Sequence, residues 1–112
     1  MDGNVKKEVE DLKMMARNWK RGYATNWIQI GEDNEYVYEE FTEDIINNFH
    51  PYINRLVECG HLTQAEAGEL VRYVHGQVQE LREETEQAAR DSAKVHPIRR
   101  LSNWLFTSRK AQ

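Results

Sequence analysis

The chain has 112 residues, of which 39% are hydrophobic and 30% charged, and this is enough for one domain with its own core. No apolar run exceeds three residues, which excludes a transmembrane helix, and the single Cys59 excludes an internal disulfide and favours a cytoplasmic protein. The formal net charge of −4 is unevenly distributed: residues 1–31 carry six Lys/Arg and four Asp/Glu, residues 32–93 carry four and fifteen, and residues 94–112 carry five and none.

Residues 4–21 are predicted to form the first helix. Their apolar side chains recur at steps of three and four, which is the helical period, and comprise Val5, Val9, Leu12, Ala16 and Trp19. Gly22 is the expected end of this helix. For residues 22–34 we expect an ordered loop that is pinned by Trp27 and Ile30.

Residues 35–58 carry the clearest core pattern, again at steps of three and four: Tyr38, Phe41, Ile45, Phe49, Tyr52 and Leu56. Pro51 interrupts this stretch, removes one backbone donor and clashes with the preceding turn. Because the apolar pattern stays in phase across Pro51, it predicts one kinked helix and not two separate helices.

A third, long helix is predicted over residues 64–93. Gly60 ends the preceding helix, Thr63 and Glu66 have the spacing of a capping box, and Leu62 can pack onto Ala67. Gly76 lies within this helix close to the apolar stripe, and we expect another helix to approach closely there. The stripe becomes thin after Leu81, and this predicts self-association through the long helix, with a homodimer as the expected form.

The fold class expected from these segments is an all-α bundle of three main helices plus a short C-terminal helix, in one domain spanning residues 1–112. Residues 94–112 are expected to be a basic amphipathic segment that Pro97 opens. The predicted core comprises Phe41, Ile45, Phe49, Leu56, Leu70, Val74 and Leu81.

Few residues offer catalytic or metal-binding chemistry. Cys59 and His61, with nearby acids such as Glu58, would be the ligands or catalytic groups of a small metal protein or enzyme, but zinc requires more paired ligands than these. The carboxylates of Glu39, Glu40, Glu43 and Asp44 are expected on a solvated helix face. We therefore expect no catalytic residue, no metal and no cofactor.

The basic, aromatic C-terminus is the best candidate for a binding site, and its candidate residues are Arg99, Arg100, Trp104, Arg109 and Lys110. Two arginines in the first turn of a helix oppose the helix dipole, so local helix stability does not explain them. The sequence favours a non-catalytic interaction module, a small regulatory or adaptor protein that binds another protein or itself. A nucleic-acid binder that uses the C-terminal segment is the first alternative, and the metal protein or enzyme is the second. A further interpretation is that this segment packs onto the acidic bundle of its own chain.

Overall fold

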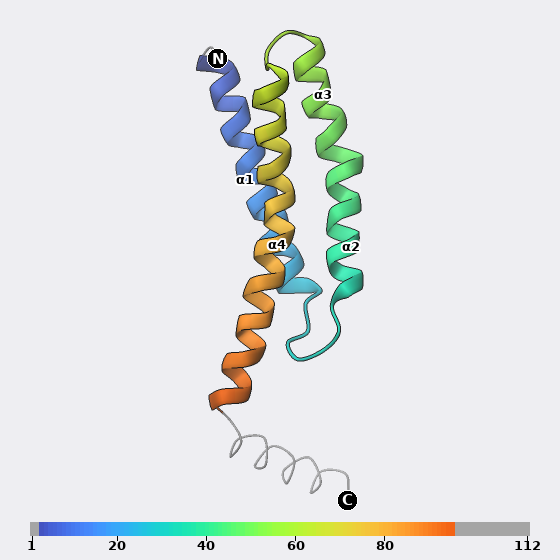
Figure 1. Cartoon of the computed structure of the whole chain (residues 1–112), viewed down its shortest axis with the longest axis vertical. Helices are drawn as coiled ribbons and strands as arrows, with labels where there is room; N and C mark the ends of the chain where they lie inside the picture. The colour runs from blue at the N-terminus through green and yellow to red at the C-terminus, as the bar shows by residue number, and fades with distance from the viewer. Residues whose placement is uncertain (1–2, 96–112) are drawn as a thin grey trace, which may run out of the picture.

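The computed structural model describes residues 3–95, and within this range it is an all-α bundle of three main helices. They are α1 (Gly3–Asn26), a second helix made of α2 (Glu35–Asp44), η1 (Ile45–Phe49) and α3 (His50–Glu58), and α4 (Gln64–Val95). The expected C-terminal helix lies outside the described residues. Figure 1 shows α4 beside both other helices, with its last turns extending past the loop that joins α1 to α2.

The predicted core is confirmed. Phe41, Ile45 and Val74 are fully buried, and Phe49, Leu56, Leu70 and Leu81 are nearly so. One hydrophobic cluster joins these residues to the buried stripe of α1, which comprises Val5, Val9, Leu12 and Ala16. The helical period of the sequence therefore identified the correct face of each helix.

The second helix is continuous across Pro51, as predicted, and its irregularity is the π turn η1 directly before the proline. In this wider turn the His50 N–H bonds to the Ile45 carbonyl, and the Asn48 side chain donates to the Asp44 carbonyl at 2.9 Å. A π turn changes the backbone pairing ahead of Pro51, which has no N–H to contribute. Ile45 and Phe49, at the two ends of this turn, both lie on the buried face, as side chains four residues apart on a helix do.

The turn between α3 and α4 forms as its sequence predicts. Gly60 has a φ of 77°, and the His61 N–H bonds to the Leu56 carbonyl at 2.9 Å, which is a Schellman ending. The Thr63 N–H bonds to the Glu66 carboxylate at 2.9 Å and the Glu66 N–H to the Thr63 hydroxyl at 3.1 Å. This reciprocal pair is the capping box.

The loop before α2 differs from its prediction. Gly22 does not end α1, which continues to Asn26, because Tyr23 packs on Phe41 and so favours one more helical turn. Trp27 and Ile30 do not pin the loop, since their side chains are 57% and 49% exposed.

Asn34 anchors this loop instead. It is 5% exposed, accepts a hydrogen bond from the Gln29 N–H at 2.9 Å, and donates to the carbonyls of Gln29 and Glu32 at 3.0 and 3.1 Å. One buried amide side chain therefore closes the loop through three backbone groups.

The expectations for α4 are corrected in two places. A Cβ added at Gly76 would meet nothing within 4 Å, so no helix approaches closely there. The stripe beyond Leu81 is partly covered by the chain itself, because Thr85 is buried and lies beside the Gly31–Glu35 loop. Arg82 also pairs with Glu35 and stacks over the Tyr38 ring, 4.3 Å from its centroid. Self-association through α4 stays a prediction, although less of this helix is left uncovered than the sequence indicated.

Candidate functional site: a long groove beside α1

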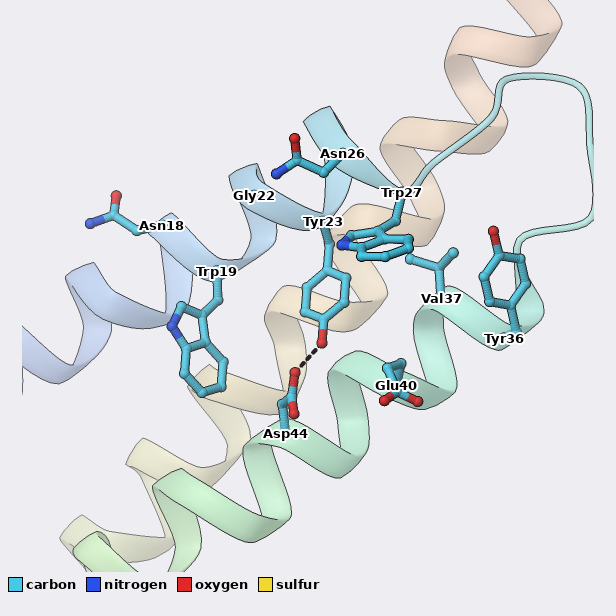
Figure 2. Close-up of a pocket in the computed structure, with 10 residues that line it drawn as sticks. All are labelled: Asn18, Trp19, Gly22, Tyr23, Asn26, Trp27, Tyr36, Val37, Glu40 and Asp44. Carbon is cyan, nitrogen blue, oxygen red and sulfur yellow. Dashed lines mark hydrogen bonds between the residues drawn. The ribbon is translucent and has the colours of Figure 1, made fainter.

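A groove of about 600 Å³ lies between the second half of α1 and the start of α2, and Figure 2 shows α4 passing behind it. Its residues come from α1, from the first residue after α1 and from α2: Asn18, Trp19, Gly22, Tyr23, Asn26, Trp27, Tyr36, Val37, Glu40 and Asp44. Trp27 and Tyr36 stand at its outer end with 57% and 56% of their surfaces exposed. Large aromatic side chains are therefore presented to solvent on this face.

Two aromatic pairs connect α1 to the second helix along this groove. The ring of Trp19 meets Phe49 edge to face at a centroid distance of 5.0 Å, and Tyr23 stacks on Phe41 at 4.8 Å. Each such pair contributes about 0.5–1.5 kcal/mol beyond the area it buries. The groove thus has an aromatic base formed by contacts between the two helices.

A hydrogen bond from the Tyr23 hydroxyl to the Asp44 carboxylate crosses the groove (Figure 2). Burial raises the pKa of Tyr23 well above its usual range, and the bond to Asp44 raises this pKa further. The phenol therefore stays neutral and keeps donating at any physiological pH. Asp44 was expected on a solvated face, but it is half-buried and has this partner.

A second hollow of about 360 Å³ continues the first along α1 and shares Trp19 with it. It is lined by Glu8, Asp11, Leu12, Met15, Trp19, Asn48, Phe49 and Tyr52. Here the Tyr52 hydroxyl donates to the Glu8 carboxylate, and this bond raises the pKa of Tyr52. We call the two hollows together the long groove. From Glu8 to Trp27 it follows α1 for roughly 28 Å at about 1.5 Å per residue.

The long groove is acidic. Among the described residues that line it there are four carboxylates, those of Glu8, Asp11, Glu40 and Asp44, and no Lys or Arg. At Tyr52 the hydrogen bond to Glu8 raises the pKa of the phenol, and the charge of Arg55 opposes this with a smaller lowering effect.

Two cations in the second half of α1, Arg17 and Lys20, contact α4 instead. The Arg17 guanidinium donates to the Tyr73 hydroxyl at 2.6 Å, and Lys20 pairs with Glu80 and Glu84 at 3.2 and 2.9 Å. Arg17 and Lys20 are therefore directed away from the groove.

Gly22 leaves the groove open at its centre. A Cβ added there would meet nothing within 4 Å, so packing does not require glycine at this position. Glycine within a helix costs about 1 kcal/mol relative to alanine. Toward the start of α1 from Gly22, the groove continues to Met15, whose side chain is 48% exposed.

The other candidate sites gain little from the structure. Cys59 and His61 are both exposed, and among residues 3–95 no three His, Cys, Asp or Glu side chains gather as a metal site would require. Instead His50 and His75, which the sequence did not associate, bring their Nε2 atoms within 2.8 Å. The predicted binding residues Arg99, Arg100, Trp104, Arg109 and Lys110 lie outside the described residues.

Sequence reasoning missed the long groove because its residues do not form one apolar stripe. On α1 the groove face alternates acids, Asn, Gly and aromatic residues, and none of these residue types alone indicates a groove. The spacing of Glu8, Met15, Trp19, Gly22 and Asn26 was the available signal, because steps of three, four and seven place these residues on one face of a helix.

Comparison of the chain with protein-family models, with curated proteins and with solved structures gives no match. Within residues 3–95, no helix combines the length and the apolar character that crossing a membrane requires.

Proposed function

We propose that this chain is a non-catalytic helical interaction module whose long groove binds an amphipathic helix of a partner protein. The observation that carries the proposal is a groove roughly five helical turns long that exposes Trp27, Tyr36 and Met15 beside carboxylates and without a lining cation. A hydrophobic groove between two helices is a common receptor for the apolar face of a third helix.

The composition of the groove supports protein binding. Trp, Tyr and Met are enriched at protein interfaces, and Trp and Tyr dominate their energetic hot spots. Aromatic side chains that already pack on one another lose little further freedom when a partner binds, which lowers the entropic cost of binding. Here these are the pairs Trp19–Phe49 and Tyr23–Phe41. The four carboxylates favour a partner helix that carries Lys or Arg beside its apolar face.

The alternatives have less support. Two of the groove carboxylates, Asp44 and Glu8, accept hydrogen bonds from tyrosines, and this role is structural. An acidic groove repels nucleic-acid phosphates, and Arg17 and Lys20 are engaged with α4, so the groove itself does not suit nucleic acid. Binding of nucleic acid through residues 94–112 stays a separate prediction. We place the module in the cytoplasm, because its single cysteine is an exposed free thiol.

The test is capture of partners from the native cell by the full chain, with two double variants compared. Trp27→Ala with Tyr36→Ala removes the exposed aromatic end of the groove. Ile30→Ala with Ile46→Ala removes as many exposed apolar side chains outside the groove, at 49% and 47% exposure. All four positions are at the surface, so both variants are expected to fold, which circular dichroism checks.

We expect the aromatic variant to lose the partner and the isoleucine variant to retain it. Loss of a hot spot worth about 2 kcal/mol weakens binding roughly 30-fold. Gly22→Phe, which fills the groove from its open centre, should have the same effect as the aromatic variant. A partner that all variants bind equally would show that the long groove is not the interface.

A further inference from the structure

The four carboxylates of the long groove are not equivalent. Glu8 and Asp44 are half-buried, and each accepts a hydrogen bond from a tyrosine hydroxyl. Asp11 and Glu40 are exposed, and neither makes a hydrogen bond or an ion pair within residues 3–95. Lys7, one helical turn before Asp11 on α1, is not paired with it either. The groove therefore presents two unpaired negative charges to a ligand.

These two charges lie toward opposite ends of the groove. Asp11 lines the hollow near the start of α1, and Glu40 lines the hollow at the aromatic end, on α2 (Figure 2). Tyr23 stacks on Phe41, the residue next to Glu40, and this contact sets the register between the two helices. From Asp11 to Tyr23 the helix rises roughly 18 Å at about 1.5 Å per residue, so about three helical turns separate the two charges.

We propose that the partner helix carries two basic residues about eleven positions apart, one at each end of its apolar face, which pair with Asp11 and Glu40. This pairing rests on the proposed function and adds the pattern by which the groove selects its partner. Residues eleven positions apart complete about three turns and lie on the same side of a helix. They are roughly 16 Å apart along its axis, and the flexible stems of Lys or Arg cover the remaining distance.

The surface between the two charges suits an apolar face. Along α1, Met15, Trp19 and Gly22 lie between the levels of Asp11 and Glu40, and all three line the groove. Gly22 leaves room there for a bulky side chain of the partner, since nothing lies within 4 Å of its added Cβ. A helix without cations would bury both carboxylates unpaired, which is costly. The groove therefore favours the order of cation, apolar face and cation.

A second copy of this chain fits the groove less well. Figure 1 shows the last turns of α4 extending past the loop between α1 and α2, where they are the part of another molecule most available to a groove. Residues 83–91 of this part carry four acids and one base. They would meet the carboxylates of the groove with like charge, which disfavours association.

Synthetic peptides of defined pattern test the pairing on the full chain. The first is a labelled, alanine-rich peptide of about 18 residues with a leucine face and a lysine at each end of that face, about eleven positions apart. The second has the same composition, but both lysines lie one turn apart at one end. In the third, glutamate replaces both lysines of the first. Fluorescence anisotropy measures the affinity of each peptide at low ionic strength, where exposed charge pairs contribute most.

We expect the first peptide to bind about fivefold more tightly than the second, because the second reaches only one of the two carboxylates at a time. The glutamate peptide should bind more weakly than either. The first two peptides have equal net charge, so a general attraction to the acidic chain does not distinguish them.

A pair of double variants assigns the difference to named residues. Asp11→Asn with Glu40→Gln should bring the affinities of the first two peptides within about twofold of each other. Glu58→Gln with Glu69→Gln removes two exposed acids outside the groove and should leave the difference in place. All four positions are at the surface, so both variants are expected to fold, which circular dichroism checks.

Equal affinities of the first two peptides for the unaltered chain would overturn the pairing, as would a failure of both to bind. A difference that persists in the Asp11 and Glu40 variant would overturn it too. The proposed function stands or falls separately, by capture of the partner with the Trp27 and Tyr36 variant. Sedimentation of the full chain reports the other occupant: a dimer that this aromatic variant dissociates would assign the groove to a second copy, against the partner helix proposed here.

Discussion

Truncation of Phe49 to alanine tests the junction on which both the core and the groove depend. Phe49 is 2% exposed, lies in the π turn, and meets Trp19 edge to face. Removing a buried phenylalanine side chain costs about 3–5 kcal/mol, and this cost includes the lost aromatic pair at about 0.5–1.5 kcal/mol. Against a total stability of about 5–15 kcal/mol for such a domain, the loss is large.

Urea denaturation of the full chain, followed by circular dichroism, measures this loss. In a separate thermal scan, at about 4 °C per kcal/mol, the melting temperature should fall by roughly 12–20 °C. Ile46→Ala is the matched control, because Ile46 lies in the same π turn with 47% of its surface exposed, and it should change the free energy of unfolding by less than about 1 kcal/mol. Equal effects of the two substitutions would refute the placement of Phe49 in the core.

Three further outcomes are expected. Gln77→Met should raise the free energy of unfolding by about 1 kcal/mol in the same urea assay, because the 2% exposed Gln77 has a side-chain oxygen without a partner among residues 3–95; a lower value would contradict this. Asn34→Ala should lower it by about 1–3 kcal/mol through the loss of three loop hydrogen bonds, and an unchanged value would show that other contacts hold the loop. Burial, and then the nearby His50, lower the pKa of His75 below its ordinary value of 6.5, so its contribution to stability is complete above that pH and is lost as the pH falls. His75→Gln should flatten this acid dependence in denaturation curves between pH 5 and 8, and His61→Gln, at an exposed position, should not.

The sequence by itself determined the parts of this protein that local chemistry controls. The helical period placed Phe41, Ile45 and Val74 in the core. Apolar side chains at this period share one face of a helix, and that face leaves water only by packing against the other helices. The capping box of Thr63 and Glu66 fixed the start of α4, because both partners lie within one turn.

The tertiary structure alone decided what depends on contacts between distant residues. Gly22 marks a local helix end, but packing of Tyr23 on Phe41 carries α1 four residues further. Asn34 anchors its loop through backbone groups that no pattern of side chains indicates.

The long groove is the largest feature of this kind. It exists because α1 meets the second helix through Trp19, Tyr23 and two tyrosine–carboxylate hydrogen bonds. These contacts hold the two helices together along one side and leave the groove between them open to solvent. On its own helix, each of these residues is an ordinary core aromatic or surface acid. Only the meeting of the two helices makes them one acidic, aromatic surface.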